Sequence, residues 1–313
     1  MSANSTLSIG WIGTGRMGYS MVSRLLKAGH VVKVYNRTQS KADPLKEYGA
    51  IVVDSISQLA ECDIVFSMVS ASQDLLQVTV GEGGVLTQTA APKIFIDCST
   101  VDESASQTVR EAAGKRGTQY LVAPVSGNGK VVKAGKLTQV VSGPRAVYDE
   151  VEPLFKIIAR AVTYVGEGDL ARLVKLAHNI LLGVVTQSLS EITVFAEKAG
   201  VPRSAFLEFI NDSVMGSVFT KYKTPAIVNL DMTTTFTPIL LRKDFDLGIA
   251  AARKLEVPMP VASAAHQIVQ KAIGRGHTDI DFAVLLLEQA ADSNLKMVPE
   301  NIQVSDGLEN EEK

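Results

Sequence analysis

A glycine-rich turn near the N-terminus constrains the fold of this chain more than any other feature. The turn Gly13-Thr14-Gly15-Arg16-Met17-Gly18 follows the apolar run Leu7–Ile12 and precedes the amphipathic run Tyr19–Ala28. Between a strand and a helix, the first glycine permits a tight turn, the second lets a pyrophosphate approach, and the third permits close packing. The helix N-terminus adds unpaired N–H groups and a partial positive charge. The turn predicts a dinucleotide-binding unit, and the alternative is an ordinary glycine-rich turn.

Two kinds of sequence follow one another along the 313 residues. Up to about residue 165, short β-branched runs alternate with amphipathic stretches such as Glu103–Lys115, the pattern of a parallel sheet covered on both faces. After Gly168 such runs stop, and residues 169–199 contain no proline and one glycine, which predicts a helix of about 30 residues. The expected strands are Leu7–Ile12, Val31–Tyr35, Ile51–Val53, Ile64–Val69, Ile94–Asp97, Gln119–Val122 and Val162–Val165. Further helices are expected at Ser204–Asp212, Thr237–Leu255, Val261–Ile273 and Asp281–Ala291.

The predicted fold class is therefore α/β, with an N-terminal doubly wound sheet of the Rossmann type followed by an all-α domain. The first domain is expected to span residues 1–166 and the helical domain residues 167–297, beginning with the long interdomain helix. The helical domain is expected to bind substrate and to form the contacts of an oligomer. The tail, residues 298–313, is polar, acidic and aperiodic, which predicts disorder.

Composition excludes several classes of protein. The 31 basic and 33 acidic residues give a formal charge of −2 without a basic run, so neither nucleic acid nor an anionic membrane is expected as a partner. Cys62 and Cys98 lack metal-ligand spacing, so no metal is expected and a reducing compartment is indicated. The N-terminus lacks the pattern of a signal peptide, and the apolar window Ile180–Val185 is shorter than the ~20 residues of a membrane span. We expect a soluble cytoplasmic protein.

The end of the second expected strand bears on the choice of dinucleotide. A site specific for NAD usually carries a carboxylate there, which binds the ribose 2′-hydroxyl. This chain has Asn36-Arg37-Thr38 instead. Arg37 offers a charged fork for a 2′-phosphate, whereas Asn36 and Thr38 add neutral hydrogen-bonding groups. NADP is the predicted cofactor, and NAD stays open because Asn36 can also bind a hydroxyl.

Several sequence blocks resemble the β-hydroxyacid dehydrogenases, the family that contains 3-hydroxyisobutyrate dehydrogenase and is similar to 6-phosphogluconate dehydrogenase. They occur in the family's order between Ile9 and about Ala290. Besides the glycine turn and Asn36-Arg37-Thr38, they are Lys27-Ala28-Gly29-His30, Asp97-Cys98-Ser99-Thr100, Ala123-Pro124-Val125-Ser126-Gly127, Lys175-Leu176-Ala177-His178-Asn179 and Lys243-Asp244-Phe245.

The resemblance implies a role for single residues. Met68 and Val69 are implied to line the cofactor with backbone, and Thr100 to lie beside the nicotinamide. Lys175 is the implied catalytic lysine, Asn179 is implied to hold the substrate, and Lys243 to reach toward the cofactor. The substrate carboxylate is assigned to the turn Ser126-Gly127-Asn128, where the family usually has Ser-Gly-Gly. In this respect the chain resembles the branch of glyoxylate and succinic semialdehyde reductases, in which the third position of the turn is also not glycine. A second departure is Ala171, where a glycine is common.

The residues of the long helix also point to Lys175 without the family. At ~100° per residue, Lys175, Asn179, Thr186 and Ser190 fall within about 60° of one another on an otherwise apolar helix. A lysine in such surroundings needs a partner, a depressed pKa or a function. The alternative is a lysine near a helix start that extends into solvent. As a catalytic group, Lys175 donates a proton to a carbonyl oxygen that accepts hydride, and accepts it back in oxidation.

The predicted activity is hydride transfer between NADP(H) and a small β-hydroxy acid or its semialdehyde, similar to 3-hydroxyisobutyrate. Reduction of glyoxylate or succinic semialdehyde is the alternative. Imine reduction is less favoured because imine reductases usually have an acid such as Asp or Tyr where Lys175 stands. A non-catalytic dinucleotide-binding module is a further alternative. Its sign in the sequence would be the loss of the lysine, but Lys175 is present. The apolar stretch Ile180–Ala196 predicts a homodimer or homotetramer formed through the helical domain.

Overall fold

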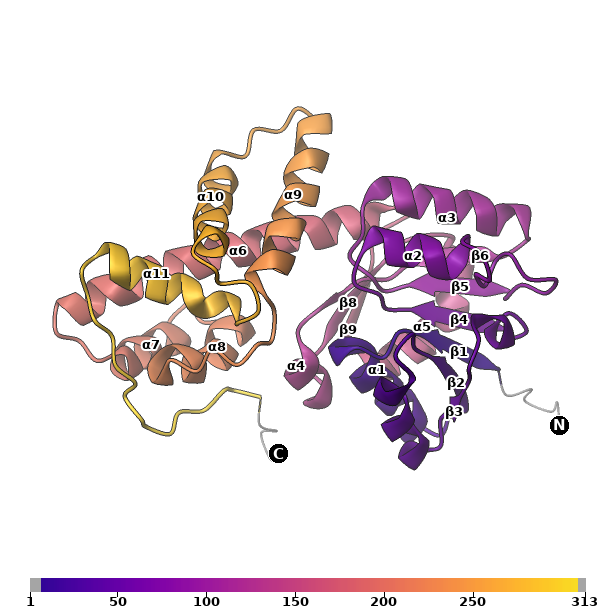
Figure 1. Ribbon diagram of the computed structural model, residues 1–313, viewed down its shortest axis with the longest axis horizontal. Coiled ribbons are helices and arrows are strands. Elements are labelled where there is room, and N and C mark those ends of the chain that lie inside the picture. The colour runs from indigo at the N-terminus through magenta and orange to yellow at the C-terminus, as the bar shows by residue number, and fades with distance from the viewer. Residues whose placement is uncertain (1–6, 309–313) are drawn as a thin grey trace. The chain divides into compact units, whose positions relative to one another are not determined.

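The computed structural model describes residues 7–308, which form two compact units divided between Lys175 and Leu176 (Figure 1). The first turns of the long helix therefore pack with the nucleotide-binding unit, although the sequence predicts that they belong to the helical domain. The expected domain boundary after residue 166 stays a prediction. Residues 1–6, where a signal peptide was not expected, and residues 309–313 lie outside the described part of the chain.

A six-stranded parallel sheet forms the centre of the first unit. Its strands follow the order β3-β2-β1-β4-β5-β6, as in doubly wound dinucleotide-binding sheets. Strands β1, β4 and β5 are buried along their whole length, which explains their continuous apolar sequences. The predicted fold class is confirmed. The strands are β1 (Ile9–Ile12), β2 (Val32–Tyr35), β3 (Ile51–Val52), β4 (Ile64–Ser67), β5 (Ile94–Asp97) and β6 (Gln119–Val122).

Helices cover both faces of this sheet (Figure 1). On one face, α1 (Arg16–Lys27) and α5 (Arg145–Ile158) pack in one apolar cluster with Trp11 and Phe66, whose rings stack 5.1 Å apart. On the other face, α2 (Ser72–Thr79) and α3 (Glu103–Lys115) pack in a second cluster. Short 3₁₀ turns lie at Gln39–Lys41, Asp43–Tyr48 and Ile56–Leu59.

A second, three-stranded sheet extends the first unit. It consists of β7 (Val125–Ser126), β8 (Thr138–Val141) and β9 (Ala161–Tyr164), with the short helix α4 (Gly129–Lys133) between β7 and β8. The strand expected at Val162–Val165 forms as β9, but it pairs with β8 rather than with the main sheet. An apolar run predicts a strand without naming its partner, so the second sheet was not foreseen.

The second unit is all-helical, as predicted. The helix expected over residues 169–199 forms as α6 (Leu170–Lys198). This helix is long and apolar enough to cross a membrane, but 56% of its most apolar window is buried within the protein, as in the core helix of a globular domain. The other helices are α7 (Arg203–Asp212), α8 (Val218–Asn229), α9 (Pro238–Lys254), α10 (Pro260–Gly274) and α11 (Leu285–Asp292), with a 3₁₀ turn at Phe282–Val284.

Helices α6 and α9 approach one another closely because each has a glycine at the contact. A Cβ on Gly183 of α6 would lie 2.3 Å from the Phe245 ring, and a Cβ on Gly248 of α9 would lie 2.5 Å from Ile180. Larger residues at either position would push the two helices apart. The close approach brings the turn of α6 after Lys175 against the turn of α9 that contains Asp244.

The described part of the tail packs on the helical unit. Residues 298–308 contain no helix or strand, but the Arg203 side chain donates one hydrogen bond to the carbonyl of Val298, and Glu300 accepts from the Arg203 amide. The Asn229 side chain donates a hydrogen bond to the Ile302 carbonyl and accepts one from the Ile302 amide. These contacts hold residues 298–302 against the helical unit, and the expected disorder of residues 298–313 stays a prediction.

Candidate active site

The glycine turn has a backbone that side chains would not allow. Gly13 has a φ of +96°, and a Cβ there would lie 2.3 Å from the carbonyl oxygen of Met68. A Cβ on Gly18 would lie 2.0 Å from the carbonyl oxygen of Gly13. Trp11 donates a hydrogen bond to that same oxygen at 2.8 Å. Gly13 and Gly18 therefore close the turn against β1 and the loop after β4.

The start of α1 fits a dinucleotide phosphate. No side chain caps the helix at Gly15, so its first amides keep their hydrogens for a ligand. A Cβ on Gly15 would meet nothing within 4 Å, which leaves room at this position. The hydroxyl of Thr14 is buried and has no hydrogen-bond partner among residues 7–308. Arg16 is exposed and Met17 half-buried at the same helix end. The residues present can thus hold the predicted cofactor.

Asn36 and Arg37 follow β2 at the same edge of the sheet. The Asn36 amide oxygen accepts a hydrogen bond from Thr14 N–H, and its nitrogen donates to the carbonyl of Thr38, each at 2.8 Å. Asn36 therefore braces the glycine turn. Arg37 is 86% exposed and lies 3.2 Å from a carboxylate oxygen of Asp74 on α2. Exposed ion pairs are weak, so a phosphate can replace Asp74.

The loops after β4 and β5 lie beside the turn. Met68 N–H donates to the carbonyl of Ile12, and Val69 N–H donates to the Ser99 hydroxyl, each at 2.9 Å. Thr100 follows Ser99 and is half-buried. Cys98 is fully enclosed, and burial raises the pKa of its thiol well above the usual range. Cys98 is thus a structural thiol rather than a nucleophile.

The turn predicted to bind a carboxylate lies between β7 and α4. Gly127 has a φ of +133°, and a Cβ there would lie 2.8 Å from Val131, so only glycine suits the position. Ser126 is half-buried at the end of β7. The Asn128 side-chain oxygen caps α4 by accepting from the amides of Lys130 and Val131. Its side-chain nitrogen is buried and has no hydrogen-bond partner in the described part of the chain.

Lys175 and Asn179 lie one turn apart on α6. Lys175 is half-buried and is the last residue of the nucleotide-binding unit, whereas Asn179 is 4% exposed and belongs to the helical unit. Thr186 and Ser190, the other members of the predicted polar stripe, donate their hydroxyl hydrogens to backbone carbonyls of α6 itself. Those two residues are therefore satisfied within the helix.

Asn179 is held by a residue that the sequence analysis did not single out. Its side-chain nitrogen donates to a carboxylate oxygen of Asp244 at 2.5 Å, and Asp244 is 1% exposed. The other carboxylate oxygen of Asp244 lies 3.2 Å from the Lys243 ammonium. The His178 ring nitrogen Nδ1 lies 2.9 Å from the Asn179 side-chain oxygen. The Lys243-Asp244 pair was visible in the sequence, but a buried carboxylate reveals its partner only in the fold.

Most of the predicted residues fall into two groups, whereas Lys175 and the turn Ser126-Gly127-Asn128 belong to the first unit but to neither group. The carboxyl ends of β1, β2, β4 and β5 place the glycine turn, Asn36-Arg37-Thr38, Met68, Val69 and Thr100 at one edge of the main sheet, where doubly wound folds bind their ligands. Asn179 and Lys243 belong to the helical unit, where α6 and α9 meet. Among residues 7–308, no group of three His, Cys, Asp or Glu side chains is arranged to hold a metal ion.

Comparison with protein families identifies both units. Residues 8–166 match the NAD binding domain of 6-phosphogluconate dehydrogenase, and residues 169–287 match the model described as NAD-binding of NADP-dependent 3-hydroxyisobutyrate dehydrogenase. The chain belongs to the 3-hydroxyisobutyrate dehydrogenase-like β-hydroxyacid dehydrogenases. This membership confirms the predicted family, the nicotinamide dinucleotide cofactor and the enzyme class, an NAD(P)-dependent hydroxyacid dehydrogenase.

Individual members of the family are similar over nearly the whole chain. Glyoxylate/succinic semialdehyde reductase 1 of Arabidopsis thaliana is 33% identical over 90% of this chain and 97% of its own length. The 2-(hydroxymethyl)glutarate dehydrogenase of Eubacterium barkeri is 30% identical over 91% of this chain and 96% of its own. The solved structure of Mycobacterium tuberculosis 3-hydroxyisobutyrate dehydrogenase with L-serine has a TM-score of 0.79 at 26% identity, and the match covers 90% of this chain and 99% of that one.

Proposed function

We propose that this dehydrogenase transfers hydride between NADP(H) and a short substrate that carries a carboxylate and an aldehyde, or the corresponding β-hydroxy acid. The observation that carries the proposal is the position of Lys175. It belongs to the unit that contains the glycine turn, and Asn179, one helical turn further on, is held by buried Asp244. A cation and an oriented amide thus stand one turn apart on a single helix.

In reduction, Lys175 supplies the proton. The glycine turn would hold NADPH, which would supply hydride to the carbonyl carbon and leave negative charge on the carbonyl oxygen. The Lys175 ammonium stabilises that charge and donates its proton to the oxygen, which yields the alcohol. In oxidation, neutral Lys175 accepts the hydroxyl proton. Asn179 orients the substrate, and Asp244 fixes the Asn179 amide so that its oxygen and nitrogen cannot exchange places.

The turn Ser126-Gly127-Asn128 is the proposed carboxylate site. Gly127 keeps the backbone open, and the unpartnered Asn128 side-chain nitrogen is a buried donor that a carboxylate oxygen would satisfy. The Lys243 side chain is proposed to reach toward the cofactor. Arg37 is proposed to bind the 2′-phosphate in place of Asp74, which supports NADP over NAD as the cofactor.

A substrate panel tests this function. We expect the purified chain to consume NADPH, seen as loss of reduced-nicotinamide absorbance, with short aldehydes that carry a carboxylate. Matched aldehydes of equal length without the carboxylate are expected to react about 10-fold more slowly or worse, because the charged contacts at residues 126–128 are lost. Equal rates with both sets would contradict the carboxylate site. Turnover of imines alone would contradict the reaction.

Reduction of glyoxylate or succinic semialdehyde is the second candidate. Two Arabidopsis thaliana relatives carry these substrates in their names, at 33% and 30% identity. The asparagine at position 128 also supports this branch over a 3-hydroxyisobutyrate-like substrate. The same panel separates the two candidates, because glyoxylate and succinic semialdehyde differ in length from methylmalonate semialdehyde.

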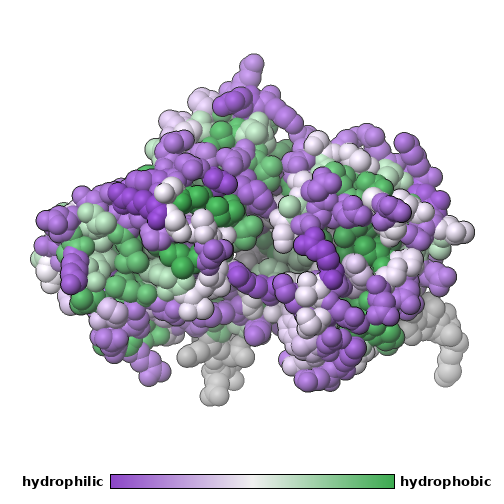
Figure 2. Space-filling model, viewed as in Figure 1, coloured by the Kyte–Doolittle hydropathy of each residue, from purple (hydrophilic) through white to green (hydrophobic). Residues whose placement is uncertain are grey.

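We infer that the helical unit forms a homodimer or homotetramer. Large apolar side chains on this unit are exposed, including Phe195 at 76%, Phe209 at 71% and Met215 at 71%. Figure 2 shows hydrophobic surface on the helical unit. Exposed apolar area of this kind is typical of a subunit interface. A cytoplasmic location is likewise proposed, and the two buried free cysteines support it.

A further inference from the structure

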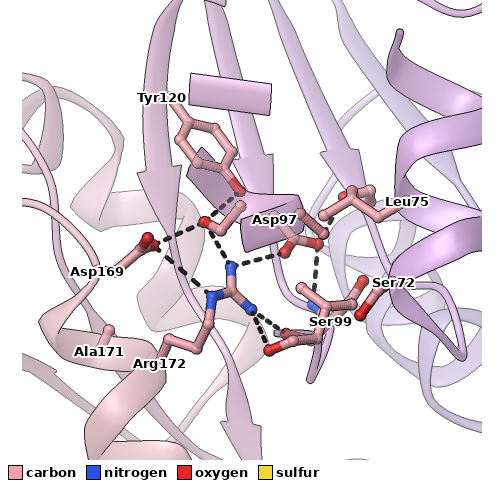
Figure 3. A network of polar contacts seen from close by, with 12 residues as sticks. Ser72, Leu75, Asp97, Ser99, Tyr120, Asp169, Ala171 and Arg172 are labelled. Atoms are coloured by element: carbon pink, nitrogen blue, oxygen red, sulfur yellow. Dashed lines mark hydrogen bonds and ion pairs between the residues drawn. The ribbon is translucent and has the colours of Figure 1, made fainter. Parts of the chain in front are cut away.

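A buried polar network surrounds Arg172, in the first turn of α6 (Figure 3). The Arg172 side chain is 1% exposed, and its Nη2 donates to a carboxylate oxygen of Asp97 at 3.2 Å and to the Ser106 hydroxyl at 3.0 Å. Ser106 in turn donates to Asp169 at 2.7 Å. Asp97, Ser106 and Arg172 are all buried, so water does not replace any of these bonds.

The second terminal nitrogen of the guanidinium, Nη1, binds the loop after β5. Nη1 of Arg172 lies 3.3 Å from the carbonyl oxygen of Ser99 and 3.4 Å from that of Val101, the residues on either side of Thr100. The Ser99 hydroxyl accepts the Val69 N–H. One side chain thus fixes the two loops that are proposed to line the cofactor.

Arg172 also lies one helical turn before Lys175. Side chains three residues apart lie on the same face of a helix, so the bonds of Arg172 fix the turn from which Lys175 projects. The division between the two units follows Lys175 directly. The turn containing both residues is therefore anchored to the loops at Val69 and Thr100.

We propose that Arg172 is a positioning residue that sets the place of Lys175 relative to the cofactor loops. This role rests on the proposed function of Lys175 as proton donor. Arginine suits the task because its rigid fork presents five N–H donors, so one side chain can bind a carboxylate, a hydroxyl and two carbonyls at once. Lysine keeps the charge but cannot span these four acceptors.

Arg172→Lys tests the proposal against a matched control. Arg203 is also 1% exposed, and it donates to both carboxylate oxygens of Glu197 and to the carbonyls of Val228 and Val298, none of them a proposed site residue. We expect Arg172→Lys to lower kcat about 10- to 100-fold while the substrate KM and NADPH Kd change less than about threefold, because a small misplacement of a catalytic group is costly. Arg203→Lys should lower the melting temperature similarly and leave kcat unchanged.

A double-mutant cycle then shows whether Arg172 acts through Lys175. If it does, Arg172→Lys lowers residual kcat no further in a Lys175→Ala background. Losses that multiply in the double variant, or an unchanged kcat in Arg172→Lys, would overturn the proposal while leaving that for Lys175 intact. Full activity of Lys175→Ala alone would overturn both. Should Arg172→Lys not fold, Ser106→Ala removes one acceptor of the guanidinium, and an unchanged kcat there is the contrary result.

Discussion

At the scale of single residues, Arg37 is the residue that we propose to select NADP over NAD. It stands where an NAD-specific site has a carboxylate, and its partner Asp74 is a surface residue that a phosphate can replace. We predict that Arg37→Ala weakens NADPH binding about 10- to 150-fold, since a charged contact of about 1.5–3 kcal/mol is lost, and leaves NADH binding nearly unchanged. Trp11, the single tryptophan, donates to the carbonyl of Gly13, so we expect its fluorescence to change when a dinucleotide binds at the glycine turn.

Asp74→Asn is the matched control for that measurement. It removes the carboxylate that competes for Arg37 and keeps the shape of the side chain, so NADPH should bind a few-fold more tightly and NADH as before. Equal loss of both cofactors in Arg37→Ala would show that Arg37 serves the fold or the pyrophosphate. A native chain that prefers NADH would contradict the choice of NADP.

The sequence allowed some residues of the site to be predicted and not others. Residues that local backbone geometry requires could be assigned. Gly13 and Gly18 are examples, because the turn between strand and helix has no room for a larger side chain at these positions. Asn36 was predicted as a neutral cofactor ligand, but its oxygen is used by the Thr14 amide. Asp244 and Arg172 were not predicted as site residues, because their roles arise from partners far away in the sequence.

At the scale of elements, different glycines of the turn before α1 serve the stability of the fold and the binding of the cofactor. We predict that Gly18→Ala lowers the melting temperature by several degrees, since its Cβ would lie 2.0 Å from a backbone oxygen. Gly15→Ala should leave the melting temperature unchanged, because its Cβ meets no atom within 4 Å, but should weaken NADPH binding by occupying the space left for the phosphate. Thermal unfolding and Trp11 fluorescence provide the two readouts. Equal effects of both variants on stability would contradict this division.

Helices and strands were predictable where one long, uninterrupted stretch of sequence carries the signal. Helix α6 was assigned to within one residue at each end, because a long run without proline ends at Gly200 and Pro202. Helix α8 was not assigned, and it contains Pro225, a residue that ordinarily argues against a helix interior. Strand β9 was assigned, but its partner β8 could not be read from its composition.

At the scale of the whole molecule, exposed apolar residues of the helical unit predict its assembly. We expect light scattering at micromolar concentration to give a dimer or tetramer, and Phe195→Glu on α6 to shift it toward the monomer, because a charge replaces an apolar side chain at the contact. Tyr48→Glu in the nucleotide-binding unit, also at an exposed apolar residue, should leave the assembly unchanged. A monomeric native chain would contradict the proposed oligomer.

At the scale of the whole enzyme, the proposed chemistry depends on Lys175, and the turnover of Lys175→Ala tests it most directly. We predict a fall in kcat of about 10³-fold or more, with NADPH affinity and melting temperature nearly unchanged, because proton donation and stabilisation of the growing alkoxide are lost together. Lys175→Arg should restore little activity, since a guanidinium holds its proton, and Asn179→Ala should be milder. If Lys175→Ala keeps more than about a tenth of native turnover, Lys175 is not the proton donor.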